Sequence, residues 1–173
     1  MLNEKILTHS KSLSELTCIM MHYFNDLRLS EHAIKAYTYA RIISEGEELP
    51  EADRFILSAA AILHDIGIPQ AIKIHGSAKA EFQEKEGALL VPELLEQAGI
   101  QDDKKERIAW LVGNHHTFVL AETDFLLQIL MEADYLVNLA EGNQSARSAL
   151  EVREGFFKTN TGKRLITALF NLE

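Results

Sequence analysis

Hydrophobic residues recur along this chain at spacings of three and four, the period of an α-helix with one buried face. No stretch alternates apolar and polar residues over the length of a strand, and no segment is repeated. The pattern predicts an all-α protein, a bundle of about seven to eight helices. The expected helices are 12–26, 30–46, 51–66, 80–98, 103–114, 122–142, 144–157 and 161–171.

Glycine and proline residues indicate where the regular segments break. Gly67 and Pro69 follow the third expected helix and end it. Pro92 lies inside the fourth, which predicts a kink or two shorter pieces. The stretch 67–80 has no clear period and is expected to be a loop. Because no linker divides the chain, one domain is expected over 1–173, with a core of about 30–142 on which helices 12–26 and 144–171 pack.

Composition and charge exclude several classes of function and location. A length of 173 residues suits one domain with a real core, and the net charge of −9 disfavours stable nucleic-acid binding, which needs clustered Lys and Arg. No run approaches the ~18 apolar residues of a membrane span, and the first residues do not resemble a secretion signal. The single cysteine, Cys18, cannot form an internal disulfide. We therefore expect a cytoplasmic protein without membrane contacts.

The segment 54–63, RFILSAAAIL, is apolar on almost every face and is followed at once by His64 and Asp65. A helix of this kind belongs in the centre of a fold. A carboxylate at its carboxyl end is disfavoured twice, by burial and by the negative end of the helix dipole. A cation bound at this point would remove both costs.

Asp134 is also placed on an apolar face, with Leu130 and Val137 on the same side of its helix. Glu132 falls roughly opposite and is expected to face solvent. Asn138, one turn after Asp134, is expected to hydrogen-bond Asp134 without binding a metal itself.

His32 shares a helix face with Ala36, Tyr39 and Ile43. Alone, a histidine on an apolar face is more often a packed core residue, and a buried aspartate is more often a cap or an ion-pair partner. Two histidines and two aspartates on three apolar helices together favour a metal site.

These residues resemble a known family. The order His32, LHDIG at 63–67 and then Asp134 is similar to the HD superfamily of metal-dependent phosphohydrolases, which have an all-helical core. The match extends over about 30–171. It includes EHAIKAYTYARIISEGEEL and AAILHDIGI, and the segments FQEKEG, VGNHHT, QILMEADYLVNL and EGFFKTNTGKRL resemble small stand-alone bacterial HD proteins.

The resemblance implies that His32, His64, Asp65 and Asp134 bind one divalent ion. Imidazole and carboxylate ligands suit Mn, Fe, Ni, Zn or Mg. The ion would activate water to attack a phosphomonoester or a nucleotide phosphate, and Asp65 would orient or deprotonate that water. The expected partner is thus a small phosphorylated substrate.

Some HD branches bind a second ion with paired histidines, which His115 and His116 match. Gln83, four residues before Gly87, stands where those branches have another histidine, so one ion is expected and a second is left open. His115 and His116 are then expected to line the pocket as proton donors or phosphate contacts. The alternative for each is packing beside Trp110 or capping a helix.

Four further residues are candidates for the substrate pocket. Lys73 and Lys79 are expected to contact phosphate, and Gln83 and Glu86 to order water or substrate; simple solvation is the alternative for all four. Two other functions stay open: a ligand-sensing HD module without turnover, and a di-iron oxygenase, against which Gln83 counts. The apolar segment 165–170 is compatible with either core closure or a homo-oligomer.

Overall fold

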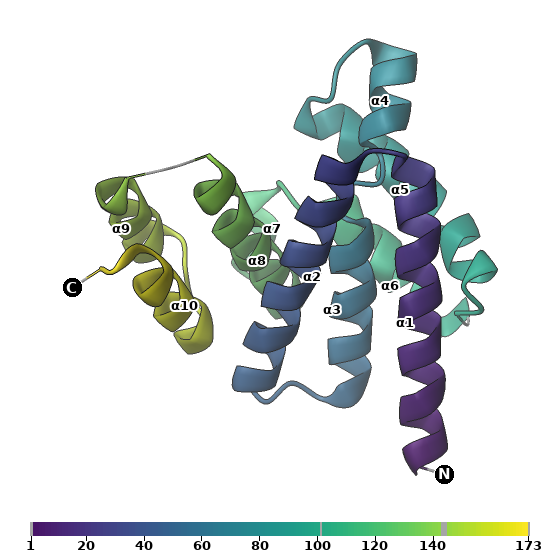
Figure 1. Ribbon diagram of the computed structural model, residues 1–173, viewed down its shortest axis with the longest axis horizontal. Helices are drawn as coiled ribbons and strands as arrows, with labels where there is room; N and C mark the ends of the chain where they lie inside the picture. Colours follow the sequence, from purple (N-terminus) through teal and green to yellow (C-terminus); the bar gives the residue numbers. More distant parts are fainter. Residues whose placement is uncertain (1, 101, 143–144, 173) are drawn as a thin grey trace.

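The computed structural model describes residues 2–100, 102–142 and 145–172, and every regular element in these ranges is an α-helix (Figure 1). The all-α prediction is therefore confirmed. The helices are α1 Leu2–Phe24, α2 Leu27–Gly46, α3 Glu51–Leu63, α4 Ile68–His75, α5 Ala80–Gln97, α6 Asp102–Val112, α7 Phe118–Ala121, α8 Phe125–Glu141, α9 Ala146–Gly155 and α10 Asn160–Phe170.

The expected loop over 67–80 is wrong, because most of it is helix α4. Pro69 lies in the first turn of α4, where its missing N–H costs nothing and its fixed φ favours a helix. Gly76 ends α4 in the left-handed region, with φ of 68°. Pro69 thus lies at the start of a new helix, whereas α3 already ends at Leu63, before both Gly67 and Pro69.

Pro92 does not divide the fourth expected helix, since α5 runs through it from Ala80 to Gln97. The lost hydrogen bond is offset by packing, because Val91, Leu94 and Leu95 are buried on either side of the proline. Residue 144, where the next-to-last helix was expected to begin, lies outside the described residues; α9 starts at Ala146.

Helix α3 forms the centre of the bundle, as its uniformly apolar sequence predicts. Its residues 57–63 are all buried, and it packs against α1, α2, α6 and α8 (Figure 1). Burial of this many apolar side chains is the main stabilising contribution to a fold of this size. Because α3 is central, the residues at its carboxyl end lie inside the molecule.

The turn after α3 lies directly on α5. A Cβ atom added to Gly67 would overlap the backbone of Gln83 and Gly87, so only glycine permits this approach. The contact brings the amino-terminal turns of α5 beside His64 and Asp65. It therefore places side chains of α5 at the carboxyl end of α3.

Glu132 is fully buried, so the expectation that it faces solvent is wrong. Its carboxylate accepts hydrogen bonds from the backbone N–H groups of Lys158 and Thr159, at 2.6 and 3.0 Å, from the Thr159 hydroxyl, and from Gln128 Nε2 at 2.9 Å. The connection between α9 and α10 covers this face of α8. Both sides of α8 are consequently interior, which its sequence period did not indicate.

Among the described residues, no single helix is long and apolar enough to cross a membrane. The pair α3 and α4 meets that length and composition only when joined across a bend of 42°.

Candidate metal centre

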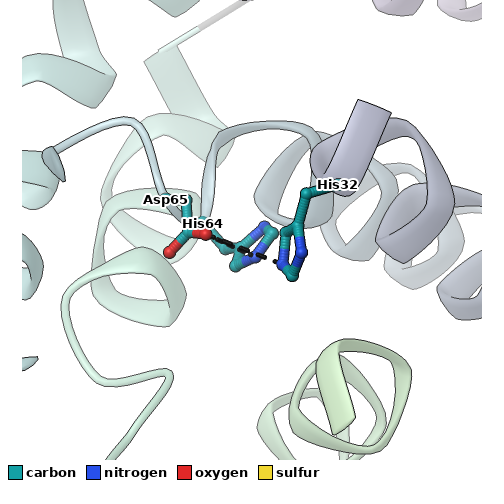
Figure 2. Close-up of side chains that lie close together, drawn as sticks. All are labelled: His32, His64 and Asp65. Carbon is teal, nitrogen blue, oxygen red and sulfur yellow. Dashed lines mark ion pairs between the residues drawn. The ribbon is translucent and has the colours of Figure 1, made fainter. Parts of the chain in front are cut away.

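Three helices bring the four expected ligands together. His32 comes from α2, His64 and Asp65 follow α3, and Asp134 comes from α8. His32 Nε2 lies 2.9 Å from Asp134 Oδ1 and 3.6 Å from Asp65 Oδ2, and His64 Nε2 lies 3.5 Å from each of the same two oxygens. Figure 2 shows His32, His64 and Asp65 converging on one point.

The hydrogen bonds of two imidazoles leave their inner nitrogens unpaired. His64 Nδ1 donates to the Ala61 carbonyl at 2.8 Å, and His115 Nδ1 donates to the Val112 carbonyl at 2.7 Å. Both rings are buried, and neither Nε2 atom has a hydrogen-bond partner. When the rings are neutral, as a bound cation requires, the lone pair of each Nε2 points toward carboxylate oxygens, and a cation between them stabilises this arrangement. The residues therefore fit a divalent metal ion.

A second group of potential ligands adjoins the first. One ligand atom each from Glu84, His115 and His116 lie within 4.8 Å of one another. Asp65 lies between the two groups, because its Oδ2 faces His32 and His64 while its Oδ1 lies 3.6 Å from His115 Nε2. A carboxylate in this position can bridge two ions.

Opposite charges packed together shift the pKa values of these groups. Burial lowers the pKa of His64, but Asp65 and Asp134 outweigh it and raise that pKa to about 9. Burial raises the pKa of Asp134, but the hydrogen bond with His32 and the nearby His64 together bring that pKa well below its usual range. Burial and then the neighbouring His115 lower the pKa of His116 to about 4. His116 is accordingly neutral at pH 7.

Without metal, the protein is expected to lose stability as the pH rises from about 6.5 through 9. The folded-state pKa of His64 lies above its unfolded value of about 6.5. Protonated His64 therefore contributes about 3 kcal/mol to the free energy of unfolding, fully below pH 6.5, and this contribution is lost as the pH rises through the folded-state pKa.

Melting temperatures measured in chelator and in Mn should diverge across this range, since a bound ion needs the neutral ring. Parallel curves would contradict the assignment. Replacing the exposed His22 by alanine should change neither curve.

Of the four residues expected in the substrate pocket, two are buried and two are exposed. Gln83 is buried, with its Nε2 3.4 Å from His116 Nε2. Glu86 is buried too, but it accepts a hydrogen bond from His75 at 2.9 Å. Lys73 and Lys79 are exposed on α4 and before α5. Among the described contacts, neither lysine touches a residue of the metal centre.

The expected hydrogen bond between Asn138 and Asp134 is absent among the described contacts. Asn138 is exposed, and the Asp134 carboxylate is hydrogen-bonded by His32 instead. One helical turn from Asp134 puts Asn138 on the edge of α8 that solvent reaches, whereas two turns put Glu141 beside His32.

Two residues at the centre, and a third that contacts Glu86, were not singled out from the sequence. Glu84 follows Gln83 and receives the backbone N–H of His116 at 2.7 Å. Glu141 accepts from His32 Nδ1, and although burial raises its pKa, hydrogen bonds from His32 and Lys35 lower it overall. His75 stacks on Phe82 with ring centroids 4.4 Å apart. The seven-residue spacing from Asp134 was a usable signal for Glu141; the other two depend on packing between helices.

Comparisons with known proteins agree with this arrangement. The family model of the HD domain matches residues 29–139, which contain all four expected ligands. The crystal structure of a predicted HD superfamily hydrolase from an uncultured Thermotogales bacterium is similar in fold, with a TM-score of 0.66 and 20% sequence identity over 91% of this chain and 84% of that one. No curated protein matches the chain significantly. The chain belongs to the HD domain family.

Proposed function

We propose that this protein is a metal-dependent phosphohydrolase that cleaves a phosphomonoester or a nucleotide phosphate. The observation that carries the proposal is the pair of buried, unpartnered Nε2 atoms of His64 and His115 on either side of Asp65. Membership of the HD family supports it, as does the fold shared with a protein described as an HD superfamily hydrolase.

The side chains have separate roles in this proposal. His32, His64, Asp65 and Asp134 would hold a divalent ion. The ion would supply a Lewis acid that lowers the pKa of a water molecule and polarises a phosphoryl oxygen. Asp65, which lies between the two groups of ligands, would orient the attacking water. His116 is neutral at pH 7 and would offer a ring nitrogen as a hydrogen-bond acceptor, and Gln83 Nε2 beside it would donate to a substrate oxygen.

We also propose that two ions bind, in place of the single ion expected from the sequence. That expectation rested on Gln83, whose amide is a poor substitute for imidazole. In the structure Glu84 lies with His115 and His116, and its carboxylate is a suitable ligand. The second group, joined to the first by Asp65, supports a two-ion centre.

The two-ion arrangement keeps a second candidate function open. A di-iron oxygenase needs two adjacent metal positions, and Glu84 weakens the objection that Gln83 raised. Iron content after anaerobic purification, together with oxygen consumption, separates this candidate from hydrolysis. A ligand-sensing module would bind a nucleotide without turnover.

Elemental analysis combined with a substrate panel tests the proposal. Wild-type protein reloaded with Mn should hold about two ions per chain and hydrolyse at least one phosphomonoester or nucleotide. Asp134→Ala should lose the first ion and the activity, whereas Asp103→Ala, which alters an exposed ion pair with Lys104, should behave as wild type. Metal binding without hydrolysis of any compound would contradict the enzymatic function. One ion with activity would contradict only the second site.

A further inference from the structure

His32 is held between two carboxylates of the same helix. Its Nε2 lies 2.9 Å from Asp134 Oδ1, and its Nδ1 lies 3.0 Å from Glu141 Oε2. Asp134 and Glu141 are seven residues apart, which is about two turns, and so they share one face of α8. One helix therefore contacts the imidazole from the inner and the outer side.

The acceptor at Nδ1 distinguishes His32 from His64 and His115, the other two imidazoles whose Nδ1 has a hydrogen-bond partner. His64 and His115 each donate to a neutral backbone carbonyl three residues earlier in their own segment. Of these three residues, only His32 has a carboxylate as the partner of Nδ1, and that carboxylate comes from a different helix. A carboxylate acceptor fixes the ring tautomer and makes the opposite nitrogen a stronger metal ligand than a carbonyl does.

Lys35 fixes the other oxygen of the same carboxylate. It lies one turn after His32 on α2, and its Nζ donates to Glu141 Oε1 at 2.9 Å. Lys35 and Glu141 are 49% and 39% exposed, so this ion pair itself adds little stability. Its effect is to hold both oxygens of Glu141, so that Oε2 stays directed at His32.

We propose that Glu141 is a positioning residue of the metal centre, which keeps His32 protonated at Nδ1 with Nε2 directed at the ion, and that Lys35 holds Glu141 in place. The inference rests on the metal centre of the proposed function. In this role Glu141 would touch neither substrate nor ion and would act through His32.

The test measures metal affinity instead of activity. Zn dissociation constants are determined at pH 7 by competition with a chromophoric chelator for wild type, Glu141→Gln and Glu141→Leu. Glu141→Leu should bind the ion of the first group about 10- to 100-fold more weakly. Glu141→Gln should lose less, because an amide oxygen still accepts from Nδ1, and Lys35→Met should also show a smaller loss. Glu45→Gln, which removes an exposed ion pair with Arg41, should equal wild type.

A merely structural role is separated by two further readouts. The melting temperature of each variant in chelator reports folding alone, and the exchangeable Nδ1 proton of His32 in the Zn-loaded protein reports the hydrogen bond. That proton resonance should move in Glu141→Gln and be lost to exchange in Glu141→Leu. Wild-type affinity in Glu141→Leu, or a loss explained entirely by reduced folding, would overturn the inference. Metal binding by wild type without any hydrolysis would overturn the proposed function and leave this inference standing.

Discussion

Replacing Asp65 by asparagine should abolish hydrolysis and empty both groups of ligands. Asparagine keeps the shape of the side chain but removes the charge from the residue that lies between the two groups. Asp65 Oδ2 lies 3.6 and 3.5 Å from the Nε2 atoms of His32 and His64, and Oδ1 lies 3.6 Å from His115 Nε2. The expected fall in kcat/KM is about 1000-fold or more, since both the ions and the orientation of water are lost.

The measurement pairs kinetics with elemental analysis of the same preparations. Asp103→Asn is the matched control, because Asp103 is exposed and pairs only with the neighbouring Lys104 among the described contacts. If Asp65→Asn kept one ion and most of the activity, the bridging position of Asp65 would be wrong. If Asp65→Asn lost the activity and kept both ions, Asp65 would act on the water without holding metal.

Replacing Glu132 by alanine should destabilise the fold by about 3 kcal/mol or more while leaving the metal centre able to bind. The substitution removes the hydrogen-bond acceptor of the backbone N–H groups of Lys158 and Thr159 and of the Thr159 hydroxyl. Gln128 Nε2 keeps a bond to the Phe156 carbonyl. Because Glu132 faces α10 and Asp134 faces the ligands, metal affinity per folded chain should change little.

Urea denaturation in chelator measures the loss of free energy, and chelator competition measures the affinity. Glu151→Ala should change the free energy of unfolding by less than about 0.5 kcal/mol, since its ion pair with Arg147 is exposed. The loss of unfolding free energy in Glu132→Gln should lie between those of Glu132→Ala and Glu151→Ala. The amide oxygen of glutamine can still accept a hydrogen bond, whereas its NH₂ group faces other donors. A loss in Glu132→Ala no larger than in Glu151→Ala would show that the connection between α9 and α10 is held by its apolar contacts alone.

The helical fold was predictable from the amino-acid pattern, which also singled out four residues that the structure brings together: His32, His64, Asp65 and Asp134. The physical reason is local: a helix repeats every 3.6 residues, so the apolar pattern shows which face is buried and which polar residues lie on it. The apolar segment before His64 marked the central helix, and the structure places that helix as α3 at the centre. The helix ends were less predictable, as Pro69 shows by starting α4.

Which side chains from different helices meet depends on packing that the sequence pattern does not report. Gln83 and Glu84 are adjacent in sequence, and the contact of Gly67 with Gly87 determines how α5 presents them to His115 and His116. Glu132 was assigned to solvent from the period of α8, but the segment that covers it lies more than twenty residues further on. Glu141 reaches His32 across 109 positions of the chain. A periodic pattern reports how each helix faces an interior, whereas the partner on the other side depends on packing between segments distant in sequence.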